Sequence, residues 1–521
     1  MKKRREESDG RTVPEGRRKP VPTVARRGGR ATTASQEADQ LELFVETADS
    51  PQGADGDDLT GQPARTRQSV PKSTNTARAE LPTMTMEEVA SEENLREAFE
   101  EVAKNDGAPG ADGQSIEQVR EQLDAVVVWL RRVLVKGNYR PGRIRRVMIP
   151  KPGGGERGLG IPDVVDRVVQ QAVHRVLSPH YEPTFYESSH GFRPRRSCHT
   201  AIAEAKRYLA EGYEWVVDLD LEKFFDRVHH QRLVARLETR VKDRQLIALI
   251  WEMLKAKVVM PDGVVVNTEE GVPQGGPLSP LLSNIVLDEL DQELARRGHR
   301  FVRYADDCNI YVRSERAGQR VMDSVVRFIE GRLRLKVNRA KSAVARPEER
   351  HFVGFSLRRE AKDGPVEVGI SKRTKDRIDD KIRELTPRTS GQSFNGTVRR
   401  LNAYLRGWVE FFGRSCTEAI VRPLHTLDAH IRRRLRALLL KQWKRKRFIA
   451  RRLIRMGARS KTVWRVIYAG RKATWALSHC GPVDYALDRG YFADRGLLSL
   501  EQHYCEMHRV VVPAQLCLDL G

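Results

Sequence analysis

Two adjacent carboxylates, Asp306 and Asp307, lie in the stretch FVRYADDCNIYV at residues 301–312. The flanking runs FVRY and NIYV are rich in β-branched and aromatic residues, and Asp tolerates the backbone of a tight turn. The pattern therefore predicts a strand, a turn and a second strand. Two carboxylates at such a tip repel each other, and a divalent cation such as Mg²⁺ would offset that repulsion. An isolated Asp-Asp pair is more often a solvated turn, so the interpretation depends on what else the chain supplies.

A second acidic stretch, WVVDLDLEKFFDRV, occupies residues 215–228. Strand alternation places Asp218 and Asp220 on one face and apolar side chains on the other. A strand buried on both faces should not carry two aspartates, so we expect their face to open on a cleft that holds a cation. The alternative is an edge strand with a polar face. Phe224 and Phe225 follow closely enough to wall the same cleft.

Two glycine-rich segments accompany the acidic stretches. Residues 143–162, RIRRVMIPKPGGGERGLGIP, predict a hairpin with Lys151 and Arg157 on opposite arms. Cations placed in this way could bind a triphosphate through charge-assisted hydrogen bonds, although the Walker pattern G-x-x-x-x-G-K-[ST] is absent. Residues 271–284, GVPQGGPLSPLLSN, carry adjacent glycines that would permit close approach of the backbone to a flat ligand.

The elements around these segments follow from periodicity. Apolar residues recur at helical spacing after Ser91 and over 118–134, 164–177, 281–294 and 321–333. Before them, residues 1–82 combine Arg, Gly, Pro, Ser, Thr and Gln with few aromatic residues. Such a composition buries too little apolar surface to offset chain entropy, so we expect disorder there. A basic arm that touches RNA is the alternative.

Charge indicates the kind of partner. The 521 residues include 93 Lys or Arg against 70 Asp or Glu, a net charge of +23 and a pI near 9.9. This excess favours nucleic acid first and an anionic membrane surface second. No apolar run is long enough for a transmembrane helix, and the basic N-terminus lacks the apolar region of a secretory signal. The six cysteines form no C-x-x-C pair, which fits a reducing compartment. We expect a cytoplasmic protein that associates with nucleic acid.

The most basic segment lies near the C-terminus. Residues 432–455 contain twelve Lys or Arg in twenty-four positions and no acid, interleaved with apolar residues at helical spacing. A solvated helix face normally mixes charges of both signs, so this pattern favours a surface for the phosphate backbone. The candidate RNA-binding residues are Arg432, Arg433, Arg434, Arg436, Lys441, Lys444 and Arg445.

Seven motif blocks between about residues 92 and 504 stand in one characteristic order. They are IPKPGGGERGLGIP, SHGFRPRRSCHTA, VVDLDLEKFFDRVHH, GVPQGGPLSPLLSN, RYADDCNIYV, LKVNRAKS and FVGFSL. In these blocks the chain resembles a bacterial group II intron reverse transcriptase and maturase, of the class C type that lacks an endonuclease. The tail shows no paired Cys and His ligands of an HNH-type endonuclease.

The resemblance implies an α+β fold of the right-hand polymerase type, with fingers and an antiparallel palm sheet followed by an α-helical thumb. The implied divisions are an extension at 1–82, fingers and palm at 83–370, a thumb or maturase domain at 371–471, and a small region at 472–521 that resembles a DNA-binding region.

The resemblance also implies residue roles. Two Mg²⁺ ions would lower the pKa of the attacking 3′-hydroxyl and stabilise the pyrophosphate leaving group. Asp220 and Asp306 would be the principal metal ligands, with Asp307 completing the acidic cluster and the Leu221 carbonyl assisting. Lys341 is the candidate general acid for the pyrophosphate.

Four further residues would contact the incoming nucleotide. Lys151 and Arg157 would bind its triphosphate, and Gln274 would lie beside it. Phe225, five residues after Asp220, would exclude a 2′-hydroxyl and so select dNTPs over NTPs.

The implied activity is RNA-directed DNA synthesis on an RNA template with a DNA primer. Implied partners are the group II intron RNA, whose splicing and retrotransposition the protein would aid, and a DNA target. The implied location is a bacterial cytoplasmic ribonucleoprotein associated with the nucleoid. Two alternatives stay open: a splicing-only maturase that binds RNA, and a domesticated or defence-associated reverse transcriptase without an intron.

Overall fold

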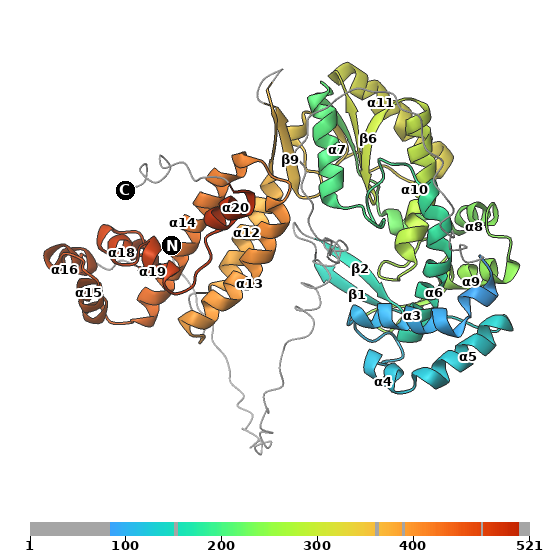
Figure 1. Ribbon diagram of the computed structural model, residues 1–521, viewed down its shortest axis with the longest axis horizontal. Coiled ribbons are helices and arrows are strands. Elements are labelled where there is room, and N and C mark those ends of the chain that lie inside the picture. Colours follow the sequence, from blue (N-terminus) through green and yellow to red (C-terminus); the bar gives the residue numbers. More distant parts are fainter. Residues whose placement is uncertain (1–83, 151–154, 360–363, 388–390, 470–472, 510–521) are drawn as a thin grey trace, which may run out of the picture. The chain divides into compact units, whose positions relative to one another are not determined.

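The computed structural model describes residues 84–150, 155–359, 364–387, 391–469 and 473–509 (Figure 1). All of these residues belong to one compact unit, in which a mixed α+β region precedes a region built largely of helices. The N-terminal extension for which we expect disorder lies outside the described residues.

Helices begin the described chain. They are α2 (Met86–Val89), α3 (Glu92–Lys104), α4 (Ile116–Glu121), α5 (Leu123–Val135) and α6 (Val164–Tyr181). Ser91 caps α3 by accepting a hydrogen bond from the Asn94 amide. The single helix predicted over 118–134 is wrong, because Gln122 leaves the helical conformation (φ −115°, ψ 15°) and separates α4 from α5.

The predicted glycine-rich hairpin is confirmed. It belongs to a four-stranded sheet in the order β2-β1-β4-β5. The strands are β1 (Ile144–Pro150), β2 (Glu156–Ile161), β4 (Val258–Val259) and β5 (Val265–Val266). Strands β1 and β2 pair in antiparallel register with Ile149 opposite Arg157, so Arg157 lies near the tip of the hairpin.

A second four-stranded sheet carries both acidic stretches, in the antiparallel order β6-β7-β3-β8. Its strands are β3 (Trp215–Leu219), β6 (Arg300–Tyr304), β7 (Asp307–Val312) and β8 (Ala343–Ala345). Both faces are buried: Val217 and Ile310 join one hydrophobic core, and Val216 and Tyr311 join the other. The sheet therefore presents its open ends, rather than a face, for chemistry.

Helices cover this sheet. Helix α7 (Cys198–Ala210) contacts β6, α11 (Glu315–Phe328) contacts β3 and β8, and α10 (Ser279–Arg296) contacts β6. The predicted apolar helices after the second glycine-rich segment and after the aspartate hairpin are thereby confirmed. Two more helices, α8 (His230–Glu238) and α9 (Arg244–Leu254), pack against each other.

The chain then forms a two-stranded sheet of β9 (Phe355–Arg359) and β10 (Val366–Ile370). The helices that follow are α12 (Lys372–Leu385), α13 (Phe394–Gly413), α14 (Val421–Gln442), α15 (Lys446–Arg455), α16 (Ser460–Tyr468), α17 (Thr474–Leu477), α18 (Gly481–Ala486), α19 (Arg489–Ala493) and α20 (Leu500–His508). Their apolar stripes are buried, as the periodicity predicts; in α14 the stripe runs through Leu424, Ile431, Leu435 and Leu438.

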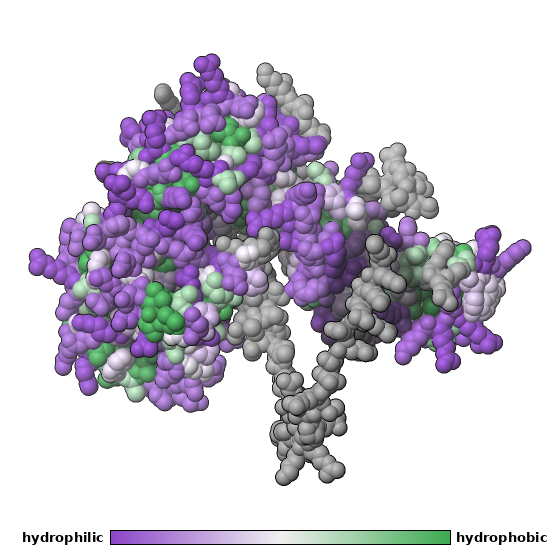
Figure 2. Space-filling model, turned by 180° about the vertical axis from the view of Figure 1, so that it is seen from behind, coloured by the Kyte–Doolittle hydropathy of each residue, from purple (hydrophilic) through white to green (hydrophobic). Residues whose placement is uncertain are grey.

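The surface seen in Figure 2 is mostly hydrophilic, with apolar side chains confined to separate patches. Among the described residues, none of the helices combines the length and the hydropathy needed to span a bilayer.

One buried arginine fixes the turn between β6 and β7. Arg303 is fully buried and donates two hydrogen bonds to the carboxylate of Asp291 in α10, over 2.7 and 2.5 Å. Its remaining donors reach Asn284 Oδ1 (3.0 Å), Ser189 Oγ (2.6 Å) and the carbonyl of Ala305 (2.8 Å). Because Ala305 immediately precedes the paired aspartates, this network sets the position of their backbone.

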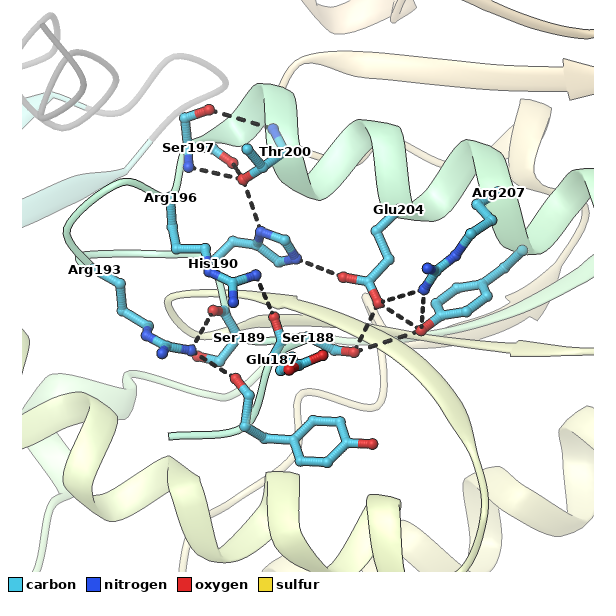
Figure 3. Close-up of polar contacts among 12 residues, drawn as sticks. Glu187, Ser188, Ser189, His190, Arg193, Arg196, Ser197, Thr200, Glu204 and Arg207 are labelled. Carbon is cyan, nitrogen blue, oxygen red and sulfur yellow. Dashed lines mark hydrogen bonds and ion pairs between the residues drawn. The ribbon is translucent and has the colours of Figure 1, made fainter. Parts of the chain in front are cut away.

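A second network, drawn in Figure 3, holds the segment 188–190, whose backbone bonds to Arg303. The ring nitrogens of His190 lie 2.8 Å from Thr200 Oγ1 and 2.7 Å from Glu204 Oε2, both in α7. Glu204 also accepts a hydrogen bond from Ser188 Oγ (2.9 Å). The backbone of this segment then pairs with Arg303, whose amide donates to the Ser188 carbonyl and whose carbonyl accepts from the His190 amide, each over 2.8 Å.

Replacing Arg303 by Met should lower the melting temperature strongly. The substitution leaves the Asp291 charge buried and unpaired, which costs about 3–5 kcal/mol. Arg296→Met is a matched control, because the exposed Arg296 pairs with Glu293 on α10, the helix that also carries Asp291. Surface pairs of this kind contribute about 0–1 kcal/mol. Equal melting temperatures for the two variants, measured by circular dichroism, would contradict the role assigned to Arg303.

Candidate active site

The predicted hairpin around the paired aspartates is confirmed. Tyr304 pairs with Asp307, which leaves Ala305 and Asp306 as a two-residue turn. Ala305 adopts the left-handed conformation (φ 55°), as tight hairpin connections require at their first position. Asp306 is half-buried and Asp307 is exposed, so both carboxylates lie at the open end of the sheet.

Asp220 lies at the same end of the sheet. Strand β3 ends at Leu219, which pairs with Cys308, so Asp220 and Asp307 come next on neighbouring strands. The Asp220 amide donates to Ser342 Oγ (3.0 Å), and its carbonyl accepts from the Asn338 amide (2.8 Å). The structure thus places the three aspartates that the sequence proposes as metal ligands at the same end of the sheet. Leu221 follows directly and bridges to Val337.

Electrostatics couples the three carboxylates. Loss of water raises the pKa of Asp306, and the charge of Asp220 raises it further. Although Asp307 keeps an exposed surface, protein atoms crowd its carboxylate and displace water, which raises its pKa well above the usual range, with added contributions from Asp306, Asp218 and Asp220. Neighbouring carboxylates whose negative charges repel are the donor set that a hard divalent cation stabilises. Within the described part of the chain, no three His, Cys, Asp or Glu side chains lie close enough together to hold a metal ion.

Asp218 departs from the expectation that it faces an open cleft beside Asp220. Arg350 pairs with Asp218 at 2.6 Å, and the Asp218 side chain is mostly buried. The same guanidinium donates to the carbonyl of Lys341. Arg350 therefore neutralises the carboxylate next to the cluster and joins it to the loop that carries Lys341.

The structure places Lys341 beside the cluster. Its Nζ lies 3.7 Å from Asp220 Oδ2, and the side chain is otherwise open to solvent. The Lys341 amide donates to the Asn338 carbonyl (3.1 Å), within the segment that also holds the Asp220 backbone. A proton donor is thus within reach of the carboxylates.

Arg157 and Gln274, two of the residues expected to contact the nucleotide, are hydrogen-bonded to each other. Arg157 Nε donates to Gln274 Oε1 over 2.7 Å, and the Gly160 amide donates to the Gln274 carbonyl over 2.7 Å. The positive charge of Arg157 also acts on Asp306, where it opposes the rise in pKa. The β1–β2 hairpin, Gln274 and the acidic cluster therefore lie together. Lys151 is outside the described residues.

Phe225 is buried in the short 3₁₀ turn Phe224–Arg227 that follows Asp220. Its ring packs edge-on against Phe224, with centroids 5.3 Å apart. Its carbonyl accepts a hydrogen bond from the Val272 amide (2.6 Å), two residues before Gln274.

The basic residues near the C-terminus divide into two sets. Arg434 donates to the Thr386 hydroxyl (2.5 Å) and to the carbonyl of Thr386 (3.0 Å), while Arg436 bonds to Asp484 and to the Leu487 carbonyl (2.8 Å). These two arginines tie α14 to neighbouring segments.

The other candidates in this region differ in exposure. Arg433 stacks over Trp475 at 4.3 Å, and burial lowers the pKa of Arg432. In contrast, Lys441, Lys444 and Arg445 are exposed at the end of α14 and the start of α15. These three side chains are open to a nucleic-acid backbone.

Arg303 and Arg350 are residues that sequence reasoning missed. Both are arginines in a basic chain, and their acidic partners Asp291 and Asp218 lie in other elements. A signal exists only for Arg303, which strand alternation places on the same face as the buried Phe301.

Comparison with known families gives two matches. Residues 149–357 match the family described as "Reverse transcriptase (RNA-dependent DNA polymerase)". Residues 375–457 match "Group II intron, maturase-specific domain". The first match contains the acidic cluster and its surroundings, and the second contains most of the basic helices.

Individual proteins agree with these matches. Protein YkfC of Escherichia coli K12 is 34% identical over an alignment 322 residues long, which covers 54% of this chain and 84% of YkfC. The group II intron-encoded protein LtrA of Lactococcus lactis subsp. cremoris is 40% identical over 183 residues, 35% of this chain and only 29% of LtrA. A chain of the solved "Partial Cas6-RT-Cas1--Cas2 complex" is 24% identical, with a TM-score of 0.31 over 47% of this chain and 42% of that one, too low to support a conclusion.

The similarity to YkfC covers most of that relative, and the two family matches follow each other in the order of the motif blocks. The chain belongs to the group II intron reverse transcriptase and maturase family.

Proposed function

We propose that this protein is an RNA-directed DNA polymerase that extends a DNA primer on an RNA template with dNTPs. One observation carries the proposal: Asp220, Asp306 and Asp307 lie at the same open end of the palm sheet, where the charge of Asp220 helps to raise the pKa of both Asp306 and Asp307 and the charge of Arg157 acts on Asp306. Membership of the reverse transcriptase family implies use of a divalent metal. The carboxylate oxygens fit magnesium, which prefers such ligands.

In this proposal Asp220 and Asp306 hold two Mg²⁺ ions, with Asp307 completing the acidic cluster and the Leu221 carbonyl assisting. Ions bound there would activate the primer 3′-hydroxyl and stabilise the departing pyrophosphate. Lys341 supplies a proton to the pyrophosphate, a role supported by its position 3.7 Å from Asp220 Oδ2.

The incoming nucleotide would be held from the opposite side. Arg157 and Lys151 bind its triphosphate, and Gln274 orients Arg157 through their 2.7 Å hydrogen bond. Phe225 lies below the sugar and excludes a 2′-hydroxyl. The burial of Phe225 supports this role, because a fixed ring discriminates by shape better than a mobile one.

The basic helices would bind the intron RNA and so aid splicing and retrotransposition into a DNA target, within the bacterial cytoplasm. We assign fingers and palm to 83–370, thumb or maturase to 371–471 and a DNA-binding region to 472–521, with 1–82 as an extension. The absence of acidic residues from 429 to 483 supports a nucleic-acid surface in this part of the chain.

Asp306→Asn should abolish primer extension on an RNA template while RNA affinity stays near that of the wild type. The amide keeps the shape of the side chain but removes the charge that holds metal, so extension should fall by at least about a thousandfold. Denaturing gels measure extension and filter binding measures affinity.

Asp124→Asn is the matched control, because Asp124 is an exposed aspartate on α5. Full-length cDNA from the Asp306 variant would contradict the proposed metal site. Parallel loss of extension and RNA affinity would show that palm chemistry and RNA binding are not separable.

Replacing Lys441, Lys444 and Arg445 together by Gln should weaken RNA binding and reduce its salt dependence without lowering the melting temperature. Each phosphate contact contributes about 0.7–0.9 to the slope of log affinity against log salt, so the slope should fall by about two to three. Affinity measured between low and moderate salt tests this.

A triple control, Arg316, Arg320 and Arg327→Gln, removes the same charge from exposed positions on α11. Equal slopes for the two triple variants would mean that only net charge matters. Arg434→Gln should instead lower the melting temperature, because Arg434 bonds within the protein.

A further inference from the structure

The backbone behind Phe225 is joined to the segment that leads into Gln274. The Val272 amide donates to the Phe225 carbonyl over 2.6 Å, and the Gly271 amide donates to the Val228 carbonyl over 2.8 Å. The position of Phe225 is therefore coupled to the loop on the other side of the proposed nucleotide site.

Gly271 permits this close approach. Its φ of 97° lies in the left-handed region, and a Cβ built there would lie 3.0 Å from the Phe225 carbonyl oxygen and 3.1 Å from Asp226 Cα. Any side chain at position 271 would push the two segments apart.

His230 holds Gly271 from the far side. The ring is almost fully buried, and Nε2 lies 2.6 Å from the Gly271 carbonyl oxygen. A carbonyl only accepts, so Nε2 carries the hydrogen and donates it. Burial lowers the pKa of His230 and so favours the neutral ring.

The orientation of the ring depends on few contacts. It packs edge-on against Trp251 in α9, with centroids 6.2 Å apart. Among the described residues Nδ1 has no hydrogen-bond partner. The bond to Gly271 is thus the polar contact that fixes the imidazole.

We propose that His230 is a positioning residue that sets the selectivity for deoxyribonucleoside over ribonucleoside triphosphates. It acts through Gly271 and Val272 on the Phe225 backbone, and so fixes how closely the Phe225 ring approaches the sugar. The inference rests on the proposed polymerase function and adds a determinant of its substrate class that does not itself touch the nucleotide.

Single-nucleotide incorporation by the full-length protein tests this, with kcat and KM measured separately for a dNTP and the matching NTP on one RNA template. His230→Leu should lower the dNTP-over-NTP ratio of kcat/KM by about tenfold, the scale of discrimination for a small steric difference in a pocket. The change should come mostly from a lower KM for the NTP. His230→Gln retains an N–H donor and should restore much of the selectivity.

Three comparisons complete the experiment. Phe225→Ala marks full loss of the barrier to NTPs. His508→Leu removes an equivalent histidine contact, 3.0 Å from the Gly413 carbonyl, away from the site and should leave selectivity unchanged. Gly271→Ala alters the residue that His230 holds and should shift selectivity in the same direction as His230→Leu.

The outcomes are distinguishable. An equal loss of dNTP and NTP use in His230→Leu, with an unchanged ratio, would overturn the inference and leave His230 a structural residue. If His230→Leu does not fold, an unchanged ratio in Gly271→Ala overturns the inference in its place. Failure of the wild type to incorporate any dNTP would instead overturn the proposed polymerase function.

Discussion

The buried ion pair between Arg303 and Asp291 is the interaction on which the site depends most. Both side chains are fully excluded from solvent. Their attraction offsets the large cost of desolvation only if the distances and angles of their hydrogen bonds are maintained. The pair connects α10 to β6, and its spare donors reach Ser189 and the Ala305 carbonyl. The buried guanidinium of Arg303 therefore fixes the turn that carries Asp306 and Asp307, although Arg303 itself touches no reacting group.

The segments that carry Arg157, Gln274 and Phe225 are joined to one another mainly by backbone hydrogen bonds. The β1–β2 hairpin bonds to the Gln274 carbonyl, and the segment before Gln274 bonds to the Phe225 carbonyl. Glycines at these crossings allow main chains to approach closely; a Cβ at Gly275 would lie 2.6 Å from the Gly160 carbonyl oxygen. Backbone bonds of this kind are independent of side-chain rotamers, so they hold a nucleotide site at fixed dimensions.

Local patterns in the sequence predicted much of this arrangement. The two strands around Asp306 and Asp307, the hairpin that bears Arg157 and the apolar helix α10 all follow from periodicity and turn residues. Contacts between residues far apart in the sequence could not be predicted from these local patterns. Arg350, for example, lies 132 positions from Asp218, whose charge it neutralises. The basic run in α14 shows the same limit, because composition does not distinguish the exposed Lys441 from Arg434, which bonds to Thr386.

The central claim is that Asp220, Asp306 and Asp307 form a binding site for divalent metal. Electron paramagnetic resonance of Mn²⁺, used in place of Mg²⁺, would count the ions bound to the protein with primer, RNA template and a non-hydrolysable dNTP. The account predicts about two ions for the wild type and a clear loss in the double variant Asp220→Asn, Asp306→Asn. Equal numbers of bound ions in the two proteins would contradict it.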